Sequence, residues 1–209
     1  EGNSEKFSTM LAKTLNLGEP LESQFLTFKF VAGEGKADVK SIDIVTCRDE
    51  TYTASAALPD VIPSSIEKDL NRRDFTVNAM AISLTGQQWG DLIDPSNGFG
   101  DIMRKRIRVL HDSSFTDDPT RMFRAVRYAT RLGFNIDSHT TELFTNALGS
   151  VDLLSGTRVR NEFEHILKEP KVCEILRKSE DLGLLGAITP ALRVGPKALE
   201  ITDELIQES

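Results

Sequence analysis

Four arginines recur at helical spacing near the middle of the chain, namely Arg121, Arg124, Arg127 and Arg131. With about 100° between successive residues of a helix, they fall on one arc of its surface. The opposite arc is apolar and carries Met122, Val126, Ala129 and Leu132. A guanidinium group donates paired hydrogen bonds to a phosphate or to a base edge. The stripe indicates an anion-binding surface, although the solvated face of an ordinary amphipathic helix has the same pattern.

Two aspartates, Asp117 and Asp118, precede Pro119 at the start of the same predicted helix. An aspartate before proline is a common helix N-cap, because its carboxylate accepts hydrogen bonds from the first free N–H groups. In a functional interpretation, one aspartate caps the helix while the other accepts hydrogen bonds from a ligand beside Arg121. The spacing alone leaves both interpretations open.

A third polar group, Arg72, Arg73 and Asp74, lies where a polar helix meets the apolar run 75–84. The structural alternative is a surface cluster of ion pairs, with Asn78 hydrogen-bonded in the core. The segment 91–111 is rich in Gly, Asn and Pro, and such a segment is most often a purely structural connection.

Three long segments in this order are similar to class II tRNA nucleotidyltransferases and bacterial poly(A) polymerases. The segments are DLNRRDFTVNAMAI, LIDPSNGFGDI with RIRVLH, and SFTDDPTRMFRAVRYATRLGF. The shorter stretches IDIVTCRDETY and TRVRNEFEHIL fit the same family, so the resemblance covers residues 1–167.

The resemblance implies a role for each matching residue. Arg72, Arg73 and Asp74 would form the catalytic RRD motif that contacts the ribose and phosphates of the nucleotide. Asp118 and Arg121 would bind the base edge, and Arg124 and Arg127 would bind the triphosphate. The turn from Gly98 to Asp101 corresponds to a hinge, and Arg158 and Glu162 correspond to a later helical motif that supports the neck.

The family also has a glycine-rich phosphate loop and a pair of aspartates that bind two Mg²⁺ ions, and neither is found in this sequence. We expect the Mg²⁺ ligands in a segment that precedes Glu1, and possible completion of the head sheet by a separate N-terminal peptide. Asp43 is either an additional acid or a structural residue. Because two-metal phosphoryl transfer needs those carboxylates, we expect this chain alone to be inactive and the complete protein to be an enzyme.

The implied reaction is the Mg²⁺-dependent transfer of CMP or AMP from CTP or ATP to the 3′ end of tRNA. The length of the Arg48–Ser64 segment favours CCA or A addition over CC addition. QFLTFKF replaces a basic stretch that is typical of poly(A) polymerases, which disfavours general poly(A) synthesis. The alternatives are a poly(A) polymerase and a non-catalytic remnant that binds RNA or nucleotides.

The helices and strands that the sequence predicts around these residues indicate an α+β fold in two parts. Residues 1–112 are expected to form a polymerase-beta-like head without its N-terminal strands, and residues 113–209 an all-helical neck and body.

In the head we expect a helix over 5–16, a hairpin of strands 25–32 and 40–47 around a turn at 33–38, and a loop over 51–63. Ser64 and Glu67 are expected to cap a helix that runs to Asn71. Strands are expected within 75–84 and at 106–110, a turn at 94–101, and helices over 117–134, 139–148, 156–168 and 171–182.

Composition sets outer limits on these interpretations. The net charge is −7, yet the window 101–131 is net positive, so an anionic ligand can be held locally by an acidic protein. No apolar run approaches the ~20 residues of a membrane span. Cys47 and Cys173 are far apart and are expected to be free thiols. The cytoplasm is the expected compartment.

Overall fold

The computed structural model describes residues 2–16, 18–22, 27–31, 41–51, 53–54, 56 and 59–195. The chain forms two compact units. The first unit comprises Glu1–Thr51 and Pro59–Arg72, and the second comprises Tyr52–Leu58 and Arg73–Ser209. The domain boundary that the sequence suggests, between residues 112 and 113, does not coincide with this division and stays a prediction.

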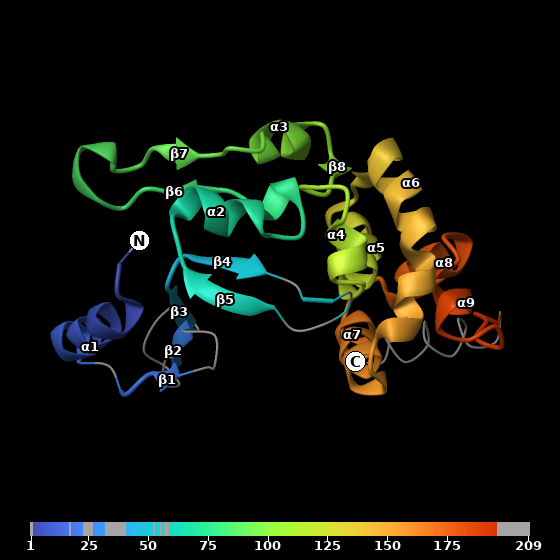
Figure 1. The fold of residues 1–209 in the computed structure, drawn as a ribbon, viewed down its shortest axis with the longest axis horizontal. Helices are drawn as coiled ribbons and strands as arrows, with labels where there is room; N and C mark the ends of the chain where they lie inside the picture. The colour runs from blue at the N-terminus through green and yellow to red at the C-terminus, as the bar shows by residue number, and fades with distance from the viewer. Residues whose placement is uncertain are drawn as a thin grey trace. The chain divides into compact units, whose positions relative to one another are not determined.

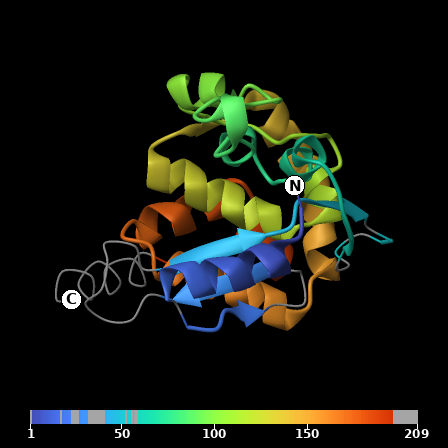
Figure 2. The ribbon, with the colours of Figure 1, turned by 90° about the vertical axis from the view of Figure 1, so that its left-hand side faces the viewer.

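The first unit begins with helix α1, Ser4–Leu15, which packs on two strands of a small sheet. Figure 2 shows α1 lying along these strands. The Asn3 side chain accepts a hydrogen bond from Lys6 N at the start of the helix. At its end Asn16 has the left-handed conformation, with φ of 50°. The helix predicted over 5–16 is confirmed, and Asn16 is the residue that ends it.

The sheet of the first unit is antiparallel, in the order β1-β2-β3. Its strands are β1 (Leu21–Glu22), β2 (Thr27–Val31) and β3 (Ser41–Val45). Phe28 and Phe30 of β2 are buried, and Lys29 between them faces outward, as the two-residue period of a strand requires. The predicted hairpin is confirmed, and its predicted turn at 33–38 lies outside the described residues.

Strands β4 (Arg48–Thr51) and β5 (Asp60–Pro63) form a second antiparallel pair. The predicted loop over 51–63 is therefore wrong at Asp60–Pro63, where four residues are too few to show a strand period. Helix α2, Ile66–Asn71, follows, and its cap is Ser65, whose hydroxyl accepts from Lys68 N. The predicted pair of Ser64 and Glu67 is wrong by one residue, since Lys68 occupies the third helical position.

The second unit opens with short elements joined by turns: η1 (Thr76–Asn78), β6 (Ala81–Ile82), η2 (Gly86–Gln88), β7 (Leu92–Ile93) and α3 (Gly98–Met103). Strands β6 and β7 pair as a hairpin. The strand expected within 75–84 is confirmed only at Ala81–Ile82. The turn expected at 94–101 continues into α3, because the Asp94 carboxylate accepts hydrogen bonds from Gly98 N at 2.7 Å and Phe99 N at 2.9 Å.

Strand β8 (Arg106–Ile107) pairs in parallel with β9 (Asn135–Ile136). The strand predicted over 106–110 is confirmed in part, and Val109 adds an isolated bridge to Phe75. The all-helical description of residues 113–209 is wrong at β9. A strand of two residues leaves no pattern in the sequence by which it could be recognised.

The remaining described residues of the second unit are mainly helical (Figure 1). The elements are α4 (Ser114–Asp117), α5 (Thr120–Leu132), α6 (Ser138–Ala147), η3 (Leu148–Leu153), α7 (Gly156–Leu167), α8 (Val172–Asp181) and α9 (Leu184–Ile188). The single helix predicted over 117–134 is interrupted at Asp118, which is extended with φ of −136° before Pro119. Gly133, with φ of 66°, ends α5. The three later predicted helices are confirmed as α6, α7 and α8.

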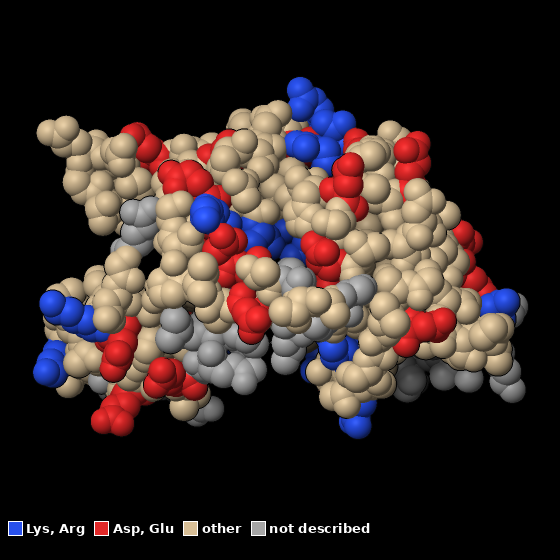
Figure 3. Space-filling view, viewed as in Figure 1, with Lys and Arg blue, Asp and Glu red and all other residues tan. Residues whose placement is uncertain are grey.

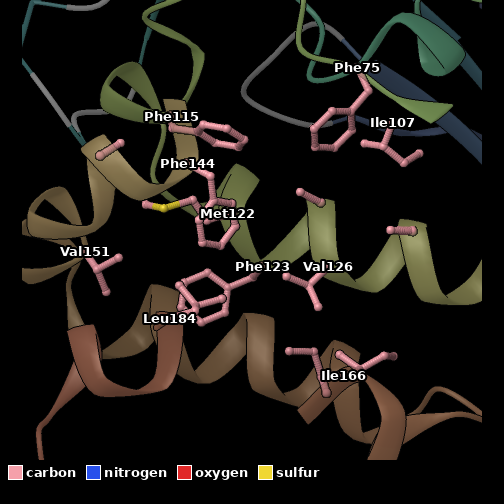
Figure 4. Packing of buried hydrophobic residues seen from close by; sticks show 14 of the residues in the cluster. Phe75, Ile107, Phe115, Met122, Phe123, Val126, Phe144, Val151, Ile166 and Leu184 are labelled. Carbon is pink, nitrogen blue, oxygen red and sulfur yellow. The ribbon is translucent and has the colours of Figure 1, made fainter. Parts of the chain in front are cut away.

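Helix α5 carries the core of the second unit (Figure 4). Its Phe123 and Val126 pack among side chains of the other helices, including Phe144 of α6 and Ile166 of α7. The predicted apolar arc is buried except at Leu132, which is 48% exposed. Cys47 and Cys173 form no disulfide in the described part of the chain. Within the ranges that the structure describes, no helix is both long enough and apolar enough to span a membrane.

Candidate functional site

The arginine stripe of α5 is not a solvated face. Arg121 is only 5% exposed and Arg127 only 7%. A buried guanidinium is stable only when partners replace the lost water. Arg124, Arg127 and Arg131 each contact a carboxylate that comes from a distant part of the sequence. The interpretation as a merely solvated face is therefore wrong.

Arg124 is held by Asp74 of the RRD motif. Its Nε donates to Asp74 Oδ2 at 2.8 Å, and its Nη2 donates to the same oxygen. The other oxygen, Oδ1, accepts from Phe75 N at 2.8 Å and from Asn78 Nδ2 at 3.1 Å. Burial by itself lowers the pKa of Arg124, but the charge and hydrogen bonds of Asp74, together with the nearby Tyr128 and Glu162, outweigh it and the pKa is raised. Asp74 thus fixes Arg124 and also the start of η1.

Glu169, which is 7% exposed, holds the far end of the stripe. Its two carboxylate oxygens each accept from Arg131 Nε at 3.0 Å, and Oε1 also accepts from Arg127 Nη1 at 3.4 Å. The hydrogen bonds from Arg131 are the main reason why the pKa of Glu169 is lowered, against the effect of its burial. Sequence reasoning missed Glu169, because nothing local marks an acid in a turn as the partner of arginines on another helix.

Tyr128 lies among three of the arginines. The guanidinium carbons of Arg124, Arg127 and Arg131 lie 5.3, 4.9 and 5.4 Å from its ring centroid. Distances below about 6 Å allow cation–π attraction. The ring therefore fixes the spacing of three positive charges that would otherwise repel one another. Sequence reasoning missed Tyr128 as well, although an aromatic residue within an arginine arc is a visible signal.

Glu162 of α7 lies near this stripe and has a carboxylate oxygen whose hydrogen-bonding capacity is unused among the described residues. Its Oε2 is buried and has no hydrogen-bond partner among the described residues, and the same is true of the buried Nε of Arg127. Burial raises the pKa of Glu162, and the charges of Arg127 and Arg124 only partly oppose this. Two buried polar atoms without partners are a common property of ligand sites.

Asp118 lies just before α5, and one of its two carboxylate oxygens accepts hydrogen bonds. Its Oδ1 accepts from Thr120 N at 3.1 Å, Thr120 Oγ1 at 2.7 Å and Arg158 Nη2 at 2.6 Å. Within the described part of the chain, Oδ2 of Asp118 accepts no hydrogen bond. Asp118 thus bonds to the first residue of α5 from the position before the N-cap, which is Pro119, while Asp117 accepts from Ser113 Oγ at 3.1 Å. Arg121 lies on the next turn, where its Nη1 donates to Ser114 Oγ at 2.8 Å.

The RRD motif spans the boundary between the two units. Arg72 belongs to the first unit, where it donates to Glu50 at 2.6 Å, to Asp69 at 2.7 Å and to the Arg48 carbonyl at 3.2 Å. These bonds tie α2 to β4. Arg73 is exposed and Asp74 is buried, both in the second unit. Asn78 is exposed rather than in the core, so the structural alternative is wrong for Asn78. Arg72 does form ion pairs, but with largely buried side chains rather than in a surface cluster.

The expected hinge at Gly98–Asp101 lies inside the second unit, not at a boundary between units. Asp101 is completely buried and accepts from Thr76 Oγ1 at 2.7 Å, Arg106 Nη2 at 2.8 Å and Arg108 Nε at 2.9 Å. Burial raises the pKa of Asp101, but these donors together outweigh it and the pKa is lowered. The segment is strongly anchored to its surroundings.

The described residues contain no group of three or more His, Cys, Asp or Glu side chains that could hold a metal ion. Asp43, the candidate additional acid, is half-exposed and lies 3.9 Å from Lys29 Nζ. These residues do not fit a Mg²⁺ site, and the Mg²⁺ ligands expected before Glu1 stay a prediction. In the space-filling view, patches of Lys and Arg lie beside patches of Asp and Glu (Figure 3).

Known proteins are similar to this chain in both sequence and fold. An A-adding tRNA nucleotidyltransferase of Geobacter sulfurreducens is 39% identical over 207 residues, which are 98% of this chain and 23% of that protein. A protein of the same name from Aquifex aeolicus is 36% identical over 202 residues, 96% of this chain and 24% of its own. The chain thus spans about a quarter of the length of these two relatives.

Two solved structures are similar over nearly the whole chain. An apo form of a CCA-adding enzyme has a TM-score of 0.88 at 35% identity, over 100% of this chain and 49% of that one. A tRNA nucleotidyltransferase complexed with a primer tRNA and an incoming ATP analog has a TM-score of 0.81 at 34% identity, over 95% of this chain and 55% of that one. The α+β fold and the resemblance inferred from the motifs are thereby confirmed.

A family model, described as the poly A polymerase head domain, matches residues 1–108. This range covers more than half of the chain and includes the RRD motif with the residues that surround Asp74. The chain therefore belongs to the family of poly A polymerase head domains.

Proposed function

We propose that this chain is the nucleotide-selecting part of an enzyme that transfers AMP from ATP to the 3′ end of tRNA. The first two relatives above are named A-adding enzymes, and one similar structure contains a primer tRNA and an ATP analog. The observation that carries the proposal is the hydrogen bonding of the Asp118 carboxylate. One of its carboxylate oxygens is held by three donors, and the other accepts no hydrogen bond from the described residues, beside a row of arginines.

The chemistry of the bases explains why a fixed carboxylate oxygen suits this task. Adenine and cytosine carry an exocyclic amino group at the position where guanine and uracil carry a carbonyl oxygen. Asp118 Oδ2 accepts a hydrogen bond from the amino group and repels the carbonyl oxygen. One such contact discriminates by about 1–3 kcal/mol. In the proposal, Arg121 contributes a donor to the same base edge.

The triphosphate is proposed to bind along the stripe at Arg124 and Arg127, with Arg73 near the ribose and phosphates. A guanidinium has five N–H groups, so it can contact a phosphate without leaving its carboxylate partner. Asp74 and Glu169 then orient the arginines before the nucleotide arrives, which lowers the cost of binding. Arg72 is proposed to hold α2 to β4 within the first unit through its bonds to Glu50 and Asp69, rather than to contact the nucleotide.

Enzymes of this family generally use a divalent metal ion, which neutralises phosphate charge and activates the attacking hydroxyl. Because the described residues do not form a site for it, the proposal assigns no reaction step to them through a metal. Their proposed work is to bind the nucleotide, choose the base and orient the phosphates.

The test is Asp118→Ala in the full-length protein, with Asp117→Ala as the matched control. Rates of incorporation into tRNA from ATP, CTP, GTP and UTP are compared, together with tRNA affinity. We expect Asp118→Ala to reduce the preference for ATP over GTP and UTP by about tenfold or more, without a matching loss of tRNA affinity. An unchanged preference refutes the selecting role of Asp118. Equal extension of unrelated RNA indicates a poly(A) polymerase, and no incorporation by the unaltered protein indicates a binding remnant.

A further inference from the structure

Arg158 joins three parts of the second unit. It lies in the first turn of α7, where its backbone N bonds to the N-cap Ser155. Its Nη2 donates to Asp118 Oδ1 at 2.6 Å, and its Nη1 donates to the carbonyl oxygen of Ala56 at 2.7 Å. The two groups are 40 and 102 residues away in the sequence. One guanidinium therefore holds both the proposed base-selecting carboxylate and the main chain of a remote segment.

Ala56 is fixed from two sides. Besides its bond from Arg158, its N–H donates to the carbonyl oxygen of Asp117 at 3.2 Å. Its φ is +59°, a conformation that side-chain-bearing residues rarely adopt. Such a conformation is unfavourable and persists only where the surroundings hold it. Among the described residues, the bonds to Asp117 and Arg158 and the packing of Ala56 against the core cluster help to hold it.

Thr120 and Arg158 have different effects on Asp118. The two bonds from Thr120 are local, because Thr120 lies only two residues after Asp118, at the start of α5. The bond from Arg158 comes from another helix and fixes the direction of the carboxylate relative to α7. With Oδ1 held from both sides, the orientation of Oδ2 is determined.

We propose that Arg158 is a positioning residue for nucleotide choice, which fixes Asp118 in one orientation and anchors the main chain at Ala56 beside it. This inference rests on the proposed selecting role of Asp118. It differs from simple support of α7, because support requires only a stable helix. Positioning requires the forked geometry of a guanidinium, whose separate N–H groups reach two acceptors at once.

The experiment uses the full-length protein and measures kcat/KM for ATP, CTP, GTP and UTP on a tRNA that lacks its terminal adenosine. The variants are Arg158→Ala, Arg158→Lys and Asp118→Ala. The matched control is Arg160→Ala, since Arg160 is on the same helix, its side chain is 79% exposed and it pairs with Glu164. The thermal midpoint and tRNA affinity of each variant are measured in parallel.

We expect both Arg158 variants to lose about tenfold or more of the preference for ATP over GTP and UTP, as Asp118→Ala does. Arg160→Ala should keep the preference of the unaltered protein. Lysine restores the charge but not the fork, so Arg158→Lys should recover thermal stability without recovering nucleotide choice. That separation is the result that a purely supporting role does not produce.

Two outcomes overturn the inference in distinguishable ways. If Asp118→Ala keeps the normal preference, the proposed function of Asp118 is wrong, and the role of Arg158 fails with it. If Asp118→Ala loses the preference but Arg158→Lys keeps it, only the role of Arg158 is wrong. Should Arg158→Ala fail to fold, Arg158→Lys decides alone, because it keeps the charge and the length of the side chain.

Discussion

Arg127 lies near two glutamates that are in opposite electrostatic situations. Glu169 accepts hydrogen bonds from Arg131 and Arg127, and its pKa is lowered. Glu162 has a buried oxygen that no described residue hydrogen-bonds, and its pKa is raised because burial outweighs the attraction of Arg127 and Arg124. The first glutamate stabilises the fold as a carboxylate, whereas the second is destabilising in that form.

Replacement of Glu162 by Gln should stabilise the protein at pH 7. A folded pKa above the ordinary value of 4.5 means that the folded state binds more protons than the unfolded state between those two values. Stability therefore falls as pH rises through this window. We expect Glu162→Gln to raise the free energy of unfolding at pH 7 by about 1 kcal/mol and to remove this decline. Urea unfolding of both proteins at pH 4, 5.5 and 7 measures the free energy of unfolding. A lower free energy of unfolding for Glu162→Gln at pH 7 contradicts the prediction.

Glu169→Gln is the matched experiment with the opposite sign. A folded pKa below the ordinary value of 4.5 contributes stability that is present above 4.5 and lost as pH falls through the lowered pKa. At pH 7 we expect Glu169→Gln to cost about 2 kcal/mol, because Arg127 and Arg131 lose a buried partner. The difference from the unaltered protein should shrink in acid. A cost that does not depend on pH would show that packing, not charge, is responsible.

At the scale of elements, the start of α3 depends on Gly98. A Cβ atom at this position would lie 2.1 Å from the Thr76 carbonyl oxygen, which is backbone and cannot rotate away. The close approach of α3 to η1 therefore requires glycine. It also brings Asp101 within reach of Thr76 Oγ1.

Gly98→Ala is expected to lower the free energy of unfolding by about 2 kcal/mol or more, since the two backbones must separate. Gly149→Ala in η3 is the control, because a Cβ there meets nothing within 4 Å. Its effect should be small or slightly stabilising. Thermal and urea unfolding of both variants tests this, and equal effects at the two glycines contradict the argument.

At the scale of the whole molecule, the two units differ in the size of their described cores. In the described residues of the first unit, the buried apolar side chains are Phe28, Phe30 and Leu70. The second unit has a large continuous cluster around α5 (Figure 4). Hydrophobic burial is the main source of stability, so regions with few buried apolar contacts open at lower free energy.

We therefore expect backbone amides of β2 and β3 to exchange with deuterium faster than those of α5. The expected difference is at least about tenfold in protection, which corresponds to about 1.4 kcal/mol of opening free energy. Hydrogen exchange followed by mass spectrometry measures it under native conditions. Equal protection in β2, β3 and α5 would mean that the two units open as one.

The sequence alone was enough to find the long helices and the motif residues. The period of apolar residues marks α5, α7 and α8, and Gly133 marks the end of α5, because these signals act over only a few residues. The same locality explains the failures at β5 and β9, which are too short for a period and form only by pairing with β4 and β8.

Only the tertiary structure determines which polar and charged groups bond to one another. Asp74 reaches Arg124 across 50 residues, Glu169 reaches Arg127 across 42, and Arg158 reaches Ala56 across 102. The sequence supplied the candidate residues, including Asp118 and the arginine stripe, because side-chain type and helical spacing are local properties. It could not show that Arg72 is held in the first unit or that Glu169 anchors Arg131. Such pairings depend on how distant elements pack, and no local spacing records that.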